Sequence, residues 1–354
     1  MKKIKMYQCG WEDPVFNEYP LAIGYLKSNC NADIELVRDS KDLIDCDYIG
    51  LSTNAWGIQE AIKLLENTNI PIILGGQGTL WDEVEKYPFK YIVKGEGESA
   101  LNYILEKEPE EKIIQLSNIK NLDSLKFPER GRCCETIPIF TSRGCCYNCN
   151  FCASSAFWGK VRFHSAEYFI SEVEYLLEKY PHITTLYIYD DLFIAHKSRF
   201  YNIYEMWMSK EWNKRLKLRS FVAARALTFD IAKKMKEMGF FQIRFGAESG
   251  SDRILKVLNK GATVEDNQRV IDIARSLRLP VKASFMHHTP TETDEDRQMT
   301  LNFIEKNKLS VQGWYQFEPF PGTKFYDGRD ISQTGMTNRD IKKRQNNKPK
   351  WMDY

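Results

Sequence analysis

Short apolar runs alternate with amphipathic stretches over the first hundred residues of the chain. Apolar runs of this length predict strands, and apolar residues at intervals of three and four predict helices. The predicted strands span residues 4–7, 48–52, 71–74 and 91–93, and the predicted helices span residues 21–28 and 58–66. This alternation is typical of a doubly wound parallel sheet.

Ligands of doubly wound sheets bind beyond the carboxyl ends of the strands. One predicted strand ends at Ser52 and Thr53, and the next is followed by Gly75 and Gly76. Glycines at such a position let a ligand approach the backbone closely. We therefore expect these four residues to line a binding site.

From residue 137 the pattern changes to six repeats of strand, loop and helix. The predicted strands span residues 137–141, 185–189, 218–222, 242–245, 281–285 and 311–316, and the clearest helices span residues 166–179, 230–238, 264–277 and 295–307. Six such units predict a partial (β/α)6 barrel, and the chemistry of such barrels lies at the carboxyl ends of the strands.

The charge-rich segment between the two patterns predicts a surface connector. The sequence therefore indicates an α/β protein with a doubly wound domain at residues 1–105, a linker at 106–136, a partial barrel at 137–330 and a short basic tail at 331–354.

Charge is nearly balanced along the chain as a whole. Fifty basic and 48 acidic residues give a formal net charge of +2, so no overall field attracts nucleic acid or an anionic membrane. The hydrophobic content of 43% is enough for two cores. Met1 and the lysines after it run straight into a predicted strand without a signal peptide, so we expect a cytoplasmic protein with reduced cysteines.

Three cysteines lie close together in one loop, with the spacing C-x3-C-x2-C at Cys145, Cys149 and Cys152. Three thiolates would leave one iron of a cubic iron–sulfur cluster open to a small molecule, whereas an electron carrier normally closes all four positions. A zinc site would need a fourth ligand, such as Cys146 or a histidine, and zinc motifs usually consist of two paired halves. No second C-x2-C occurs outside this loop.

The loop from Arg143 to Cys152 resembles the signature of the radical SAM enzymes, and the motifs at residues 189–191, 246–251 and 319–323 follow in the order of that superfamily. The resemblance implies a [4Fe-4S] cluster whose open iron binds S-adenosylmethionine and splits it into methionine and a 5′-deoxyadenosyl radical. That radical would abstract hydrogen from an unactivated carbon. A small-molecule substrate and an electron donor such as flavodoxin or ferredoxin would complete the system.

The same resemblance assigns roles to residues around S-adenosylmethionine. It places Phe151 at the adenine, Asp190 or Asp191 at the methionine amino group, and Arg225 at the methionine carboxylate. It also places Glu248 and Ser249 at the ribose hydroxyls. Because consecutive residues of an extended chain point in opposite directions, only one of the two aspartates can face the ligand.

Two histidines, His287 and His288, occupy the position after the fifth barrel strand where the superfamily commonly has a glycine-containing turn. Because alternate residues of a strand face opposite sides, one of them would project into the substrate cavity as a proton donor, a hydrogen-bond partner or a metal ligand. The alternative is a local repacking of the barrel wall.

Residues 19–26, 75–76 and 95–98 resemble the amino-terminal cobalamin-binding domain of a radical SAM subgroup that includes methyltransferases. The resemblance implies methyl transfer from cobalamin to a substrate radical. Two features depart from it: the first histidine of the chain is His164, and the connection at residues 39–45 is too short for a full helix.

The sequence therefore leaves two possibilities: the first domain binds cobalamin, or it is a vestigial cobalamin-binding fold that no longer does. The alternatives are a cobalamin-independent radical SAM enzyme that catalyses a rearrangement, dehydration, epimerisation or bond formation, and a non-catalytic iron–sulfur protein for electron transfer.

Overall fold

The computed structural model describes residues 1–10, 19–54, 57–131, 135–328 and 352. The predicted basic tail therefore lies outside the described residues except for Met352. The first sheet is entirely parallel, with the strand order β2-β1-β3-β4-β5-β6. Its strands are β1 (Lys3–Cys9), β2 (Asp33–Leu36), β3 (Tyr48–Thr53), β4 (Ile72–Gly75), β5 (Tyr91–Val93) and β6 (Ile113–Ile114). Strand β6 extends this sheet beyond the predicted limit at residue 105.

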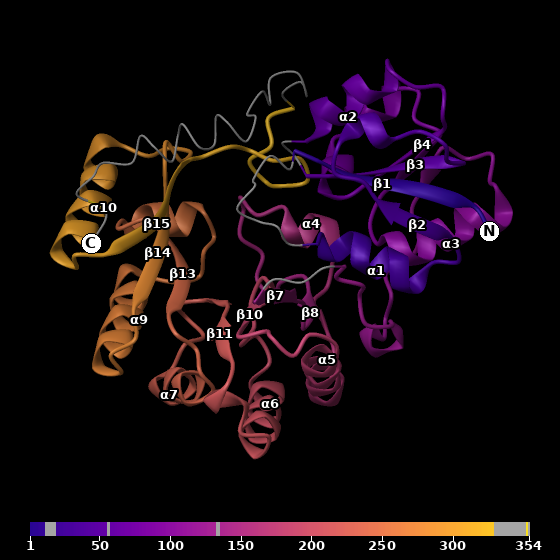
Figure 1. Cartoon of the computed structure of the whole chain (residues 1–354). Coiled ribbons are helices and arrows are strands. Elements are labelled where there is room, and N and C mark those ends of the chain that lie inside the picture. Colours follow the sequence, from indigo (N-terminus) through magenta and orange to yellow (C-terminus); the bar gives the residue numbers. More distant parts are fainter. Residues whose placement is uncertain (11–18, 55–56, 132–134, 329–351, 353–354) are drawn as a thin grey trace.

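Helices cover both faces of the first sheet (Figure 1). Helices α1 (Leu21–Asn29) and α3 (Gly97–Lys107) pack on one face, where Ile23 and Leu101 join the buried core. Helix α2 (Ile58–Leu65) packs on the other. Between β2 and β3 the chain makes only a short 3-10 turn at Ser40–Asp42, which confirms that this connection is too short for a full helix.

The second half of the chain forms the predicted partial barrel. Its parallel strands are β7 (Thr136–Ile139), β10 (Thr185–Ile188), β11 (Lys217–Arg219), β12 (Phe221–Val222), β13 (Ile243–Glu248), β14 (Val281–His287) and β15 (Ser310–Gln316). The predicted third strand is divided into β11 and β12, so the barrel consists of a three-stranded and a four-stranded sheet. The α/β fold class predicted from the sequence is confirmed.

Five long helices cover the outside of the barrel (Figure 1). They are α5 (Ala166–Lys179), α6 (Lys197–Ser209), α7 (Phe229–Glu237), α9 (Val264–Ser276) and α10 (Asp294–Lys306). Capping boxes at Thr263 and Thr293 begin α9 and α10, because each threonine side chain accepts a backbone N–H that has no partner within the helix.

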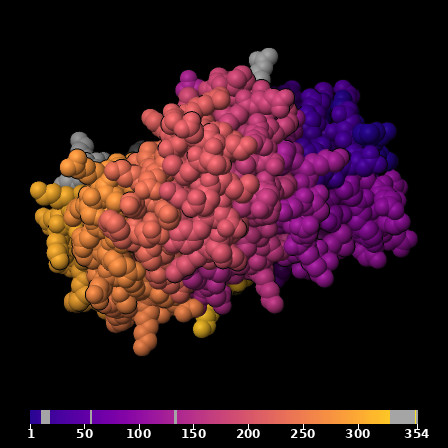
Figure 2. All heavy atoms as spheres, turned by 90° about the horizontal axis from the view of Figure 1, so that it is seen from below, coloured from indigo at the N-terminus to yellow at the C-terminus, as the bar shows by residue number. Residues whose placement is uncertain are grey.

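Shorter elements surround the cysteine loop: β8 (Ser142–Arg143), α4 (Ser154–Trp158), β9 (Arg162–Phe163) and α8 (Asp252–Val257). Helix α4 and the residues after it face the first sheet, where Asn118 donates a hydrogen bond of 2.8 Å to the carbonyl of Trp158. In the view from below, the two halves of the chain lie side by side as one continuous surface (Figure 2).

Candidate active site

The three cysteines of the motif lie in a loop that follows β8 and faces the carboxyl end of the barrel. Its backbone turns at Gly144, whose φ of 84° favours glycine. Within the loop the backbone N–H of Cys152 donates to the carbonyl of Cys149 at 3.1 Å. Asn150 fastens the loop to the end of α8, because its backbone N–H donates to Leu258 at 2.9 Å and its side chain donates to Val257 at 2.8 Å.

The three thiols share one electrostatic environment. Burial raises the pKa of Cys145 to about 11, and it also raises the pKa values of Cys149 and Cys152. The carboxylate of Asp191 adds to the rise at Cys145 and Cys152, while the ammonium group of Lys260 opposes it at Cys149 and Cys152.

These thiols suit an iron–sulfur cluster, since thiolates are its usual ligands and the cluster's positive iron favours their ionised form. Cys146, by contrast, is exposed. Over the described parts of the chain, no three histidine, cysteine or acidic side chains, the three motif thiols included, are grouped as they would be around a bound metal ion, so their binding of a cluster stays a prediction.

The two adjacent aspartates lie on opposite sides of the chain. Asp190 is buried and accepts hydrogen bonds from the backbone N–H of Thr141 at 2.6 Å and of Ser142 at 3.1 Å. It thereby fixes the turn after β7. Asp191 instead accepts a hydrogen bond from the hydroxyl of Ser154 in α4. The carboxylate nearer the cysteine loop is therefore that of Asp191.

A cavity of about 310 Å³ lies beside the cysteine loop. Its walls come from both halves of the chain and include Asn54, Phe151, Cys152, Asp191 and Phe320. Phe151 and Asp191 thus lie together next to a motif cysteine. This is where the adenine and the amino group of S-adenosylmethionine are expected, and the two contacts stay predictions.

Arg225 lies against the cysteine loop. The carbon of its guanidinium group is 3.2 Å from the centre of the Tyr147 ring, and its charge acts on Cys149. Gly261 permits this placement, because a Cβ atom there would come within 2.0 Å of the guanidinium group. Arg225 therefore remains available for its predicted role beside the cluster.

The two residues predicted to bind the ribose, Glu248 and Ser249, have different surroundings in the structure. Glu248 pairs with Lys260, with Oε1 and Nζ 2.7 Å apart. Ser249 is fully buried, and its hydroxyl is 3.1 Å from that of Thr300 in α10. The structure therefore brings Glu248 to the site, whereas Ser249 helps to hold α10 on the barrel.

Lys260 is a site residue that the sequence analysis missed. Besides pairing with Glu248, its ammonium group lies 5.7 Å from the centre of the Phe151 ring and close to two motif cysteines. It follows a short helix more than a hundred residues after the loop, so no local pattern marks it in the sequence.

His287 ends β14 and His288 directly follows it, with the Nδ1 atoms of the two rings 2.5 Å apart. The ring of His287 stacks on Trp314, with ring centres 5.0 Å apart. His288 is exposed and has a φ of 56°, and its backbone N–H donates to Glu292. Of the two, His288 is the more accessible at the carboxyl end of the strands.

A second cavity, of about 270 Å³, lies between the first sheet and the barrel. All four residues expected to contact a ligand line it, namely Ser52, Thr53, Gly75 and Gly76. It adjoins β1 and β3, where the strand order reverses and ligands of doubly wound sheets bind. Gly76 is required at its turn, since its φ is 93° and a Cβ atom would lie 2.3 Å from the carbonyl oxygen of Thr53.

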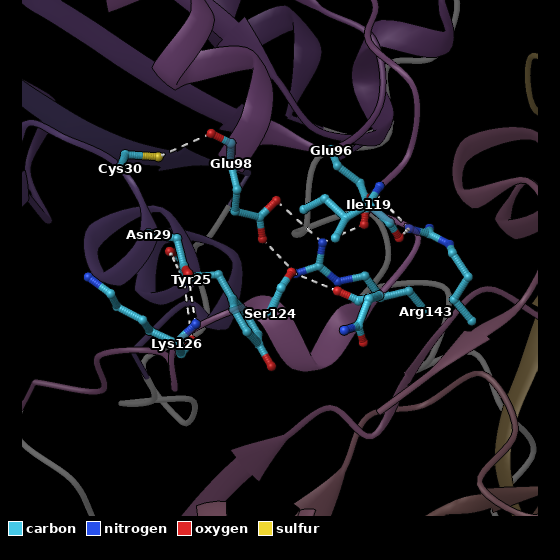
Figure 3. Close-up of polar contacts among 11 residues, drawn as sticks. Tyr25, Asn29, Cys30, Glu96, Glu98, Ile119, Ser124, Lys126 and Arg143 are labelled. Carbon is cyan, nitrogen blue, oxygen red and sulfur yellow. Dashed lines mark hydrogen bonds and ion pairs between the residues drawn. The ribbon is translucent and has the colours of Figure 1, made fainter. Parts of the chain in front are cut away.

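A buried ion-pair network joins the first sheet to the cysteine loop (Figure 3). Arg143 is two residues before the first motif cysteine, and it pairs with Glu96 at 2.5 Å and with Glu98 at 2.6 Å. Arg162 pairs with the other oxygen of Glu96 at 2.6 Å. Burial alone would lower the pKa of Arg143, but the carboxylates of Glu98 and Glu96 raise it above its usual value.

Residues 139–304 match the family model of the Radical SAM superfamily. These residues therefore form a radical SAM domain, and the protein is an enzyme. Radical SAM enzymes use a [4Fe-4S] cluster and S-adenosylmethionine. No described helix is long and apolar enough to span a membrane.

Among curated proteins, the chain is similar to an uncharacterized methyltransferase of Pyrococcus horikoshii, with 28% identity over 87% of this chain and 78% of that protein. It is also similar to the anaerobic magnesium-protoporphyrin IX monomethyl ester cyclase of Rubrivivax gelatinosus, with 22% identity over 84% of this chain and 63% of that enzyme.

Two solved structures share the fold of nearly the whole chain. TsrM of Kitasatospora setae, a radical S-adenosylmethionine methyltransferase solved with tryptophan substrate and a SAM analogue, matches 92% of this chain and 75% of its own with a TM-score of 0.74 and 15% identity. The cobalamin-dependent radical enzyme OxsB, solved with aqua-cobalamin and S-adenosylmethionine, matches 99% of this chain and 57% of its own with a TM-score of 0.69 and 20% identity. The chain thus has the fold of both proteins.

Proposed function

We propose that this protein is a cobalamin-dependent radical SAM methyltransferase that acts on a small molecule. Cys145, Cys149 and Cys152 would hold the cluster, which supplies the electron that splits S-adenosylmethionine into methionine and a hydrogen-abstracting 5′-deoxyadenosyl radical. A cobalamin between the first sheet and the barrel would supply the methyl group. A reducing protein such as flavodoxin or ferredoxin in the cytoplasm would deliver the electron.

The observation that carries the proposal is the position of the two cavities. The 270 Å³ cavity of the first sheet and the 310 Å³ cavity beside the cysteine loop share Asn54 and Gln77 in their walls. A ligand on the glycine turns of the first sheet would therefore face the cluster side of the barrel. A methyl donor must be near the substrate radical, and the shared wall favours this arrangement.

The residues of the chain would bind and orient these groups. Phe151 and Asp191 would hold S-adenosylmethionine in the cavity beside the cluster, with Arg225 at its carboxylate. Glu248, oriented by Lys260, would accept the ribose hydroxyls. The apolar walls of the 270 Å³ cavity, which include Ile4, Leu51 and Phe140, would exclude water, which protects a radical from side reactions.

A glycine variant tests cobalamin binding. In Gly76→Val, the new side chain would collide with the carbonyl of Thr53 and distort the turn, so we expect the purified protein to lose corrin while keeping its iron. Gly328→Ala is the matched control, because Gly328 also has a positive φ, of 73°, but no atom within 4 Å of an added Cβ. Corrin is measured by absorption after anaerobic purification with cobalamin supplied.

Wild-type protein without corrin, but with a cluster that produces 5′-deoxyadenosine, would favour the cobalamin-independent radical reaction. The absence of any histidine before His164 fits that candidate as well, since cobalamin domains of the mutase type supply a histidine to the cobalt. Protein that holds iron but never forms 5′-deoxyadenosine would instead be an electron carrier.

Single substitutions test the two histidines. Because His288 is exposed at the carboxyl end of β14 while His287 stacks on Trp314, we expect His288→Ala to reduce product formation more than His287→Ala. General acid–base groups typically contribute a factor of about 10² or more. The measurement is the rate of 5′-deoxyadenosine and methylated product formation. Wild-type rates in both variants would rule out a catalytic role for the pair.

A further inference from the structure

The interior of the barrel carries a cluster of arginines and tyrosines. On β10, Leu186 and Ile188 are buried in the core beneath the outer helices, whereas Tyr187 is half-buried and Tyr189, directly after the strand, is 36% exposed. Because alternate residues of a strand face opposite sides, the two tyrosines face the barrel interior. This face lies outside the set of residues assigned above to the cluster or to S-adenosylmethionine.

The same alternation places two arginines on this interior face. Arg219 of β11 follows the buried Leu218, and Arg244 of β13 lies between the buried Ile243 and Phe245. The guanidinium carbon of Arg219 lies 3.3 Å from the centre of the Tyr187 ring. Arg219, from the three-stranded sheet, and Arg244, from the four-stranded sheet, thus lie near the same tyrosines.

Arg244 shows the electrostatic character of this wall. Burial and the neighbouring charge of Arg219 lower the pKa of Arg244 to about 10, and the phenols of Tyr187, Tyr189 and Tyr315 act in the opposite direction. Among the described residues, no carboxylate pairs with Arg244, and its buried Nε has no hydrogen-bond partner. A half-buried cation such as Arg244 beside a second positive charge is unfavourable unless an anion compensates it.

The wall opens toward the reaction site. Tyr189 lines a cavity of about 370 Å³ together with Phe140 and Asn54. Asn54 also lines the cavity beside the cysteine loop, and Asp191, two residues after Tyr189, lies in that same cavity. A molecule on the arginine–tyrosine wall would therefore lie on the side of the barrel where the radical is to be formed.

We propose that the barrel interior binds a substrate with a flat unsaturated ring and a carboxylate or phosphate group. Arg244 receives the anion through its forked N–H donors, the positive charge of Arg219 adds to the attraction, and the tyrosine rings pack against the flat part of the molecule. This assignment rests on the proposed radical SAM function, for which it names the substrate class.

The test uses phenyl phosphate as a probe and benzyl alcohol as its uncharged counterpart, each titrated by calorimetry into the protein reconstituted with its cluster. We expect phenyl phosphate to bind and benzyl alcohol to bind at least about tenfold more weakly, since the alcohol cannot form hydrogen bonds between two charged groups. Arg244→Gln should weaken phenyl phosphate binding by a similar factor, and Arg244→Lys by less. Titration with inorganic phosphate shows whether the anion alone suffices for binding.

Lys217→Gln is the matched control, because it removes an exposed positive charge from the same strand as Arg219. It should leave binding unchanged. Should Arg244→Gln lose its cluster or its cooperative melting, Arg219→Gln provides the second test of the same site. Equal binding of the two probes, or unchanged phenyl phosphate binding in folded Arg244→Gln or Arg219→Gln, would overturn the assignment.

The proposed function and this assignment fail in different ways. Formation of 5′-deoxyadenosine by a protein that ignores phenyl phosphate would refute only the substrate class. A protein that binds phenyl phosphate through Arg244 but holds no cluster would refute the proposed function and leave the anion site in place.

Discussion

Replacing Cys149 with alanine is expected to abolish the iron–sulfur cluster and all cleavage of S-adenosylmethionine. With only two thiolates left in this loop, the cluster would lack one of its three protein ligands. After anaerobic reconstitution, the wild-type protein should contain about four iron atoms per chain and Cys149→Ala almost none. Cys145→Ala and Cys152→Ala should behave in the same way.

Cys146→Ala is the control for this series, because Cys146 belongs to the same loop but is exposed. It should retain the iron, the sulfide and the absorption of the wild type. A stable cluster in Cys149→Ala, or the loss of the cluster in Cys146→Ala, would show that the ligands have been assigned wrongly.

Arg143→Met is expected to destabilise the protein strongly. The arginine is only 5% exposed, and its removal would leave the carboxylates of Glu96 and Glu98 buried without their main partner. Breaking a buried ion pair in this way typically costs about 3–5 kcal/mol. The melting temperature should therefore fall by several degrees, and the cysteine loop should bind its cluster less well.

Arg162→Met is the matched control, because among the described residues Arg162 forms its ion pair with Glu96 alone, and it is more exposed, at 13%. Its effect should be clearly smaller. Adding Glu96→Gln and Glu98→Gln to Arg143→Met should recover part of the stability, since the buried charges are then removed as well. A melting temperature of Arg143→Met equal to that of the wild type would contradict the network's role.

The strands and helices with strong apolar patterns could be predicted from the sequence. Strand β5 and helix α5 have the predicted bounds, because most of their apolar residues are buried as the pattern requires. Strand β2 was missed, since Ile34 is its only buried residue. Helix α6 was missed because its tyrosines, methionines and tryptophan blur the helical spacing of its buried residues.

The candidate site was predictable only where its residues are close together in the sequence. The cysteine loop is one local motif, and strand alternation correctly implied that Asp190 and Asp191 face different ways. The contacts of Arg143 with Glu96 and of Lys260 with Glu248 depend on how separate elements pack. Ser249 was assigned to the ribose, but the packing of α10 against β13 engages its hydroxyl with Thr300.

The central claim is that Cys145, Cys149 and Cys152 hold a cluster with one iron left open for S-adenosylmethionine. Electron paramagnetic resonance of the reduced, reconstituted protein tests it most directly. We predict the signal of a reduced [4Fe-4S] cluster, and we predict that adding S-adenosylmethionine changes this signal. A site filled by zinc, or a cluster signal that stays the same with S-adenosylmethionine in excess, would contradict the account.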